Sequence, residues 1–177
     1  MRIAVCTVGG AGTIGLELSR LPQRLDVLLV ALGNGAMFNG IAHVMKARSQ
    51  GTRMIAVGSA GASAMVDSWR AGRLIEHAHV STIADGIATR TPIPEALDDM
   101  QGLADEVLLV SDDDILRGMK LLHRHTGIIA KPTDQLLRAP PLPKNHRQRE
   151  WVHCPGFPGE QSAKSAVPAV SSQAIDK

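Results

Sequence analysis

The sequence has few aromatic residues, with two Phe, two Trp and no Tyr among its 177 residues. Proteins that bind single-stranded nucleic acid stack the bases on aromatic side chains, and this chain has little material for such a surface. Its net charge is only +2, and its basic residues are scattered except for a short patch from Lys144 to Arg149. We therefore expect no nucleic-acid partner.

Cysteines and long apolar runs are also scarce. Cys6 and Cys154 lie far apart and outside any metal-spaced cluster, so we expect reduced thiols in a cytosolic protein. No segment has the length of a membrane span, and Gly9 arrives too soon after Ile3 for the apolar region of a signal peptide. These features predict a cytoplasmic protein with no membrane segment.

The histidine pairs do not predict a metal site. His77 and His79 alternate, as do His123 and His125, and residues two apart on a helix point to different sides. We expect surface histidines and no bound metal.

Apolar runs alternate with helical patterns along the first two thirds of the chain. We predict strands at Ile3–Val8, Asp26–Leu32, Thr52–Val57, Glu106–Val110 and Gly127–Ala130. We predict helices from the N-cap Thr13 to Pro22, from the second glycine segment to about Ala47, over Ala64–Arg70 up to Gly72, over Pro94–Met100, and after the capping residues Asp112–Asp114. This alternation predicts an α/β fold with an open, mostly parallel sheet flanked by helices.

The pattern stops near residue 138. From Ala139 onward the chain is rich in prolines, basic and small polar residues, and no further strand is expected. We predict a domain over residues 1–138 and a Pro-rich tail over 139–177, disordered especially from Gly156 to Lys177.

The first glycine segment, Gly10 to Gly15, has the spacing G-x-G-x-x-G after the predicted first strand. This is the fingerprint of dinucleotide-binding folds, which also need an acid near the end of the second strand. Here that strand ends in Leu32-Gly33-Asn34, and its only acid, Asp26, stands at its beginning. An NAD(P)-binding protein that uses Gly10, Gly12 and Gly15 remains an alternative.

The second glycine segment, Gly33 to Gly40, lies between an apolar strand and a helical pattern. Glycines let the backbone approach an anion closely, and the following helix offers unpaired N–H groups and the positive end of its dipole. Turns in any α/β sheet also use glycine for steric reasons. By itself, the segment is a candidate phosphate site or an ordinary turn.

Several motifs together resemble a known family. They are Gly10-Ala11-Gly12-Thr13-Ile14-Gly15-Leu16-Glu17, Gly33-Asn34-Gly35-Ala36-Met37-Phe38-Asn39-Gly40, Ala84-Asp85-Gly86-Ile87-Ala88 and Ile128-Ile129-Ala130-Lys131-Pro132. Their order and spacing resemble those of fold type II pyridoxal-phosphate enzymes, whose fold is of the tryptophan synthase beta type, and most of all the threonine/serine dehydratase and serine racemase group. The resemblance covers roughly residues 10–132 and looks like the C-terminal half of such an enzyme.

The resemblance implies pyridoxal 5'-phosphate as cofactor and serine or threonine as substrate. The family reaction eliminates the β-hydroxyl, and the product hydrolyses to a 2-oxo acid and ammonia. The family's glycine loop donates backbone amides to the cofactor phosphate, and another glycine passes beside the cofactor ring. The matching positions here are Gly33, Asn34, Gly35, Ala36 and Met37 for the loop and Gly86 for the ring. A homo-oligomer is a further expectation.

Departures from the family pattern limit the expected activity. The family's cofactor-bearing lysine stands in a Ser-(Phe/Tyr)-Lys-x-Arg-Gly segment that this sequence lacks, and Lys46 only superficially resembles it. Lys131 replaces an acid, Gly58 stands where some members have a metal-binding acid, and the later Ser-Gly-Gly-Asn segment is missing. We assign no catalytic residue and expect a fragment that is inactive alone. A remnant that binds nothing stays open as a third alternative.

Overall fold

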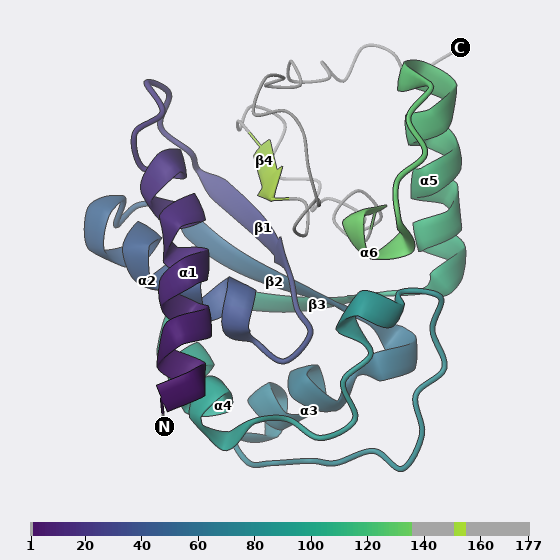
Figure 1. Ribbon diagram of the computed structural model, residues 1–177, viewed down its shortest axis with the longest axis horizontal. Coiled ribbons are helices and arrows are strands. Elements are labelled where there is room, and N and C mark those ends of the chain that lie inside the picture. Colours follow the sequence, from purple (N-terminus) through teal and green to yellow (C-terminus); the bar gives the residue numbers. More distant parts are fainter. Residues whose placement is uncertain (1, 136–150, 155–177) are drawn as a thin grey trace.

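The computed structural model describes residues 2–135 and 151–154, which form a parallel sheet with helices on both faces (Figure 1). The strands are β1 (Val27–Ala31), β2 (Arg53–Ser59), β3 (Glu106–Val110) and β4 (Trp151–Cys154), in the order β3-β2-β1-β4. Every neighbouring pair is parallel, with Val27 beside Arg53 and Ile55 beside Glu106. The predicted α/β fold with an open parallel sheet is confirmed.

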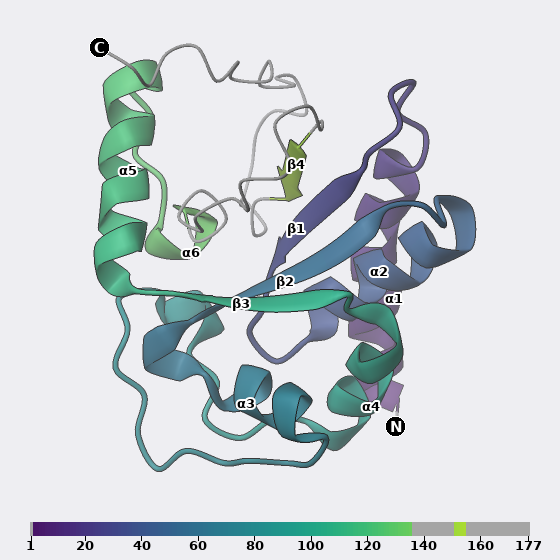
Figure 2. The same ribbon diagram turned by 180° about the vertical axis from the view of Figure 1, so that it is seen from behind.

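Six α-helices and two 3-10 turns connect the strands within these residues. They are α1 (Arg2–Leu18), α2 (Ala36–Arg48), η1 (Ala60–Ala62), α3 (Ala64–Ala71), η2 (Asp85–Ile87), α4 (Pro94–Leu103), α5 (Asp112–Thr126) and α6 (Pro132–Gln135). Figure 2 shows β1, β2 and β3 from behind, with α3 and α4 on one side and α5 leaving the end of β3. No described helix is both long and apolar enough to cross a membrane.

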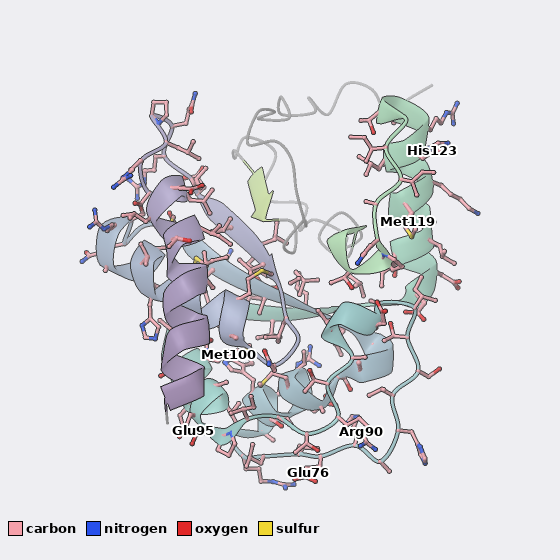
Figure 3. The ribbon with its side chains drawn as sticks, in the orientation of Figure 1. Glu76, Arg90, Glu95, Met100, Met119 and His123 are labelled. Carbon is pink, nitrogen blue, oxygen red and sulfur yellow. The ribbon has the colours of Figure 1, made fainter. Side chains whose placement is uncertain are left out.

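The first core layer lies between the sheet and the helices α1 to α4. Strand side chains such as Leu28 and Met54 pack there against Phe38 and Ile41 of α2. Met100, labelled on α4 in Figure 3, is fully buried in the same layer. Because the strands alternate their side chains, the opposite face needs its own cover.

The second core layer supplies that cover. Val27, Leu29 and Ile55 point to this face and pack with Ile87 of η2 and Ile115 of α5. Strands buried on both faces explain why the sequence of β1 is an unbroken apolar run. The short turn η2 is thus part of the core, although it lies in a long connection without regular strands.

The predicted strand at Ile3–Val8 is wrong, because these residues belong to α1. Thr13 is no N-cap either, since it lies inside α1 and its hydroxyl donates to the carbonyl of Gly10, 2.8 Å away. Further along α1, Gly15 packs closely on α2. A Cβ on Gly15 would lie 2.8 Å from the Ile41 carbonyl oxygen, so only glycine permits this approach of the two helices.

Two predictions near the C-terminus are also wrong. Gly127–Ala130 is no strand: Gly127 ends α5 with a φ of 71°, and Ile129 is 83% exposed, whereas a strand of this sheet would be buried. A strand does occur after Ala139, because β4 pairs with β1 from Trp151 to Cys154. The disorder predicted from Gly156 to Lys177 falls outside the described residues.

Helix ends follow the sequence more closely. Gly72 caps α3 with a φ of 64°, and Pro94 opens α4 as predicted. At α5 the N-cap is Ser111, whose hydroxyl accepts from the amide of Asp114 in a capping box. Hydrogen bonds from the Ser111 hydroxyl and Arg117 lower the pKa of Asp114.

Candidate functional site

The second glycine segment forms the connection between β1 and α2. β1 ends at Ala31, the amide of Leu32 still donates to the Val57 carbonyl over 2.8 Å, and α2 begins at Ala36. Gly35 is the N-cap of α2 with a φ of 91°, and a Cβ there would lie 3.3 Å from the Cβ of Ala96. This position therefore demands glycine for both its dihedral angle and its space. Ala36 is already helical, so replacing a family glycine there costs no strain.

The start of α2 presents amide groups that have no protein acceptor. Within the described residues, the amides of Gly33, Asn34, Gly35 and Met37 donate no hydrogen bond. The amide of Ala36 donates to the Oδ1 of Asn34 over 3.2 Å. Unpaired amides at a helix N-terminus attract an anion, because the hydrogen bonds and the helix dipole act in the same direction. The loop has the chemistry of a phosphate site without any charged side chain.

The structure brings two of the matched motifs together and places Thr133, which directly follows a third, beside them. A Cβ on Gly33 would lie 3.2 Å from the Cα of Ile87, so the glycine loop touches η2. A Cβ on Gly86 would lie 3.0 Å from the Oγ1 of Thr133, so η2 also touches α6. Gly33, Gly86 and Thr133 come from segments that are distant in the sequence, yet they line one region beside the carboxyl ends of the strands. This is where parallel α/β sheets bind ligands.

A hydrogen-bond network holds this region in place. The Ser59 hydroxyl, at the end of β2, donates to the Thr82 Oγ1 over 2.7 Å. Thr82 in turn donates to Asp112 Oδ1 over 2.7 Å, and the amide of Ile83 donates to Asp112 Oδ2 over 2.9 Å. Ser59 and Asp112 stand at the carboxyl ends of neighbouring strands, which fastens the connection leading to η2. Sequence patterns did not reveal this network, although its polar residues directly follow two predicted strands.

The amide side chain of Asn39 fixes the glycine loop from the other side. Asn39 is completely buried in α2, and its Nδ2 donates to the carbonyl of Ala96 over 2.8 Å. That carbonyl belongs to α4, whose Ala96 also contacts the Gly35 position. The bond therefore ties the first turn of α2 to α4. Asn39 belongs to the Gly33–Gly40 motif, but the sequence alone did not indicate this anchoring role.

Lys46 lies at the opposite end of α2 from the glycine loop. Its Nζ donates to both carboxylate oxygens of Asp105, over 2.8 and 2.6 Å, and the amide of Met54 donates to the same carboxylate over 2.7 Å. Burial raises the pKa of Asp105, but the hydrogen bonds from Lys46 and Met54 and the charges of Lys46 and Arg53 outweigh it and lower the pKa. This pairing places the Lys46 amine away from the glycine loop, which agrees with its only superficial resemblance to the family's lysine.

No metal-binding group of three or more His, Cys, Asp or Glu residues occurs in residues 2–135 and 151–154. Gly58 lies inside β2, where a Cβ would meet the Cγ2 of Val66 at 2.9 Å. His77, on the connection after α3, has its Nε2 3.2 Å from Oδ2 of Asp67 in α3. His123 is exposed on α5 (Figure 3).

Curated relatives are catabolic L-threonine dehydratases of Staphylococcus aureus. The protein of strain USA300 is 32% identical over 124 residues, which are 70% of this chain and 36% of the relative. With strain N315 the identity is 32% over 169 residues, or 96% of this chain and 46% of the relative. The chain thus spans less than half the length of these curated relatives.

Solved structures of a threonine deaminase and a serine racemase are also similar to this chain. The processed form of threonine deaminase isoform 2 from Solanum lycopersicum superposes with a TM-score of 0.71 at 27% identity, covering 75% of this chain and 38% of that chain. A serine racemase of maize gives 0.69 at 28% identity, covering 73% and 41%. A model of the family described as pyridoxal-phosphate dependent enzyme matches residues 5–134. This chain belongs to the family of pyridoxal-phosphate-dependent enzymes.

Proposed function

We propose that this chain is the phosphate-holding part of a pyridoxal-phosphate-dependent enzyme of the threonine/serine dehydratase type. The observation that carries the proposal is the set of unpaired amides at Gly33, Asn34, Gly35 and Met37. Those amides and that of Ala36 bind the cofactor phosphate, and Asn34 releases the Ala36 amide when the phosphate binds. The helix dipole of α2 adds to the attraction.

Gly86 is the proposed neighbour of the cofactor ring. It lies next to Ile87, which contacts the glycine loop, and a Cβ at position 86 would press on the Thr133 side chain, so glycine suits this close approach of η2 and α6. The network of Ser59, Thr82 and Asp112 keeps this backbone at a fixed distance from the loop. When bound, the cofactor supplies an electron-withdrawing ring that stabilises negative charge on the substrate. The chain's own contribution is to bind and orient that group.

Elimination also needs an amine that moves a proton at the substrate. The 177-residue sequence contains no segment that matches the family's lysine segment, and Lys46 is paired with Asp105. Lys131 also replaces an acid of the family pattern. We therefore propose that the isolated 177-residue chain binds the cofactor and has little or no dehydratase activity.

The finer parts of the proposal keep the expectations drawn from the sequence. We propose serine or threonine as the amino acid that the complete active site binds, a cytoplasmic location, no nucleic-acid partner, and a homo-oligomer. We also keep the division into a domain over residues 1–138 and a tail over 139–177. Sedimentation of the purified chain tests the oligomer, because a single monomeric species would contradict it.

A titration with pyridoxal phosphate, followed by ¹H–¹⁵N NMR and by absorbance, tests the proposal. We expect saturable shifts of the Gly33, Asn34, Gly35 and Met37 amides, and no shifts there with pyridoxal, which lacks the phosphate. A chain that binds neither compound would instead be a remnant without a ligand. A stable absorbance band of a lysine-bound cofactor would contradict the claim that the chain holds no reactive lysine.

A further inference from the structure

A cavity lies at the opposite end of β1 from the glycine loop. Its volume is about 620 Å³, and it is formed by the end of α1, the connection before β1, and the end of α2. Leu18, Leu25 and Met45 give it an apolar wall, whereas Arg24, Arg48 and Ser49 give it polar groups. This end of the sheet carries the amino ends of the strands, so the cavity is separate from the proposed cofactor site.

The cavity has positive charge and no negative charge on its wall. Arg24 and Arg48 both line it, and none of its lining residues is acidic. Within the described residues, neither guanidinium forms an ion pair with a carboxylate. The position of Arg48 in the last turn of α2 suits the helix dipole, but Arg24 lies in a connection where no such reason applies.

The turn that follows α2 adds backbone hydrogen-bond donors, whereas the C-terminal end of α2 itself carries the negative end of the helix dipole. Ser49 is the C-cap of α2, and its carbonyl accepts from the amide of Thr52 over 2.8 Å, which turns the chain at Gln50 and Gly51. In the described part of the chain, the amides of Gln50 and Gly51 donate no hydrogen bond. Two guanidinium groups and two unpaired amides among the lining residues form a donor set that matches a carboxylate or a phosphate.

The Arg24 guanidinium lies where a side chain at position 51 would stand. A Cβ on Gly51 would overlap the Arg24 guanidinium, so the arginine lies directly over the glycine backbone. Gly51 is not among the glycines with positive φ, so its backbone conformation does not itself require glycine. The absence of a side chain at this position instead makes room for the guanidinium.

We propose that this cavity is a binding site for a small organic oxyanion, a carboxylate or a phosphate. The oxyanion binds between Arg24 and Arg48 and accepts hydrogen bonds from the Gln50 and Gly51 amides. Its carbon skeleton contacts Leu18 and Leu25. The site is independent of the cofactor phosphate site, because the two lie at opposite ends of the β1 and α2 unit.

A ¹H–¹⁵N NMR titration of the full chain tests the site, with inorganic phosphate and acetate as separate probes at constant ionic strength. We expect saturable shifts of the Gln50 and Gly51 amides with at least one probe, and the probe that binds tells phosphate from carboxylate. Shifts of the Gly33 to Met37 amides would report binding at the proposed cofactor site, and they are not evidence for this cavity. No saturable shift at Gln50 and Gly51 with either probe would overturn the proposal.

Four variants separate a built site from general attraction of anions. Arg24→Gln and Arg48→Gln should each weaken binding at least about tenfold, because each removes a charged hydrogen bond. Gly51→Ala keeps every charge but displaces Arg24, and should also weaken binding. Arg73→Gln removes an equally exposed arginine outside the cavity and should have no effect. Equal losses in Arg24→Gln and Arg73→Gln would contradict the proposal.

Discussion

The two glycine-rich segments look alike in the sequence and serve different purposes in the structure. Gly10 to Gly15 lies within α1, where Gly15 lets that helix pack closely against α2. Gly33 to Gly40 follows a strand, and there Gly35 takes a left-handed conformation at the N-terminus of α2. The first segment is a packing surface, whereas the second exposes amides.

This difference shows that glycine spacing alone does not define a phosphate site. The spacing G-x-G-x-x-G indicates a dinucleotide site only where a strand precedes it and a helix begins within it. In this chain the strand before it is missing, so the NAD(P)-binding alternative loses its structural basis. The second segment has both the strand and the helix start.

The largest expected effect concerns packing between α1 and α2. Gly15→Ala should lower the free energy of unfolding by about 1–3 kcal/mol, because its Cβ would lie 2.8 Å from a backbone oxygen. Gly10→Ala is the matched control in the same helix, since a Cβ there meets nothing within 4 Å. It should stabilise the chain by about 0.5–1 kcal/mol. Urea denaturation measures both, and equal effects would contradict the packing role.

The next effect concerns the left-handed residue at the start of α2. Gly35→Ala should cost about 1–2 kcal/mol of stability, because alanine disfavours a φ of 91° and meets Ala96. Gly33→Ala tests the loop without this dihedral requirement, since Gly33 is not among the glycines with positive φ, although its Cβ would press on Ile87. Thermal unfolding compares the two. A Gly35→Ala chain as stable as the wild type would show that the conformation at position 35 is not needed.

A smaller effect is expected where the second glycine segment depends on its surroundings. Thr82→Val removes the hydroxyl that joins Ser59 to Asp112, and should cost about 1–2 kcal/mol. Thr82→Ser keeps the hydroxyl and should cost less. Hydrogen exchange at Ile83 and Ala84 should be faster in Thr82→Val, because their amides bond to Asp112 and Thr82. Unchanged exchange would mean that the network does not hold this segment.

The smallest expected effect is at the far end of α2, away from the glycine loop. Asp105 has a lowered pKa in the folded chain, so its contribution to stability is complete above the unfolded-state pKa of about 3.9 and is lost as the pH falls through the lower folded-state pKa. Asp105→Asn should therefore be less stable at neutral pH and show a weaker loss in acid. Asp98→Asn, at an exposed position of α4, is the control. Identical acid profiles for the wild type and Asp105→Asn would contradict this role.

Much of the fold could be predicted from local patterns. The apolar runs of β1 and β2 are continuous because both faces of these strands are buried. Gly72 and Pro94 mark helix boundaries because glycine tolerates a positive φ and proline lacks an N–H group. The helical state of Ile3 to Val8 could not be predicted, because a short apolar run cannot be told from part of a helix by its periodicity alone. The pairing of β4 with β1 likewise depends on a contact between distant segments.

The candidate site shows the same division. The position of the glycine loop followed from the order of strand, turn and helix. The meeting of Gly33 with Ile87 and of Gly86 with Thr133 is a tertiary fact that no local pattern contains. The anchoring role of Asn39 is another, since it rests on a bond to Ala96, 57 residues away.

The central claim is that the second glycine segment, and not the first, binds the cofactor phosphate. Equilibrium dialysis of pyridoxal phosphate against the wild type, Gly35→Ala and Gly10→Ala tests it most directly. We predict at least about tenfold weaker binding for Gly35→Ala, because misplaced amides lose charge-assisted hydrogen bonds, and unchanged binding for Gly10→Ala. Unchanged binding in Gly35→Ala, or a loss confined to Gly10→Ala, would contradict it.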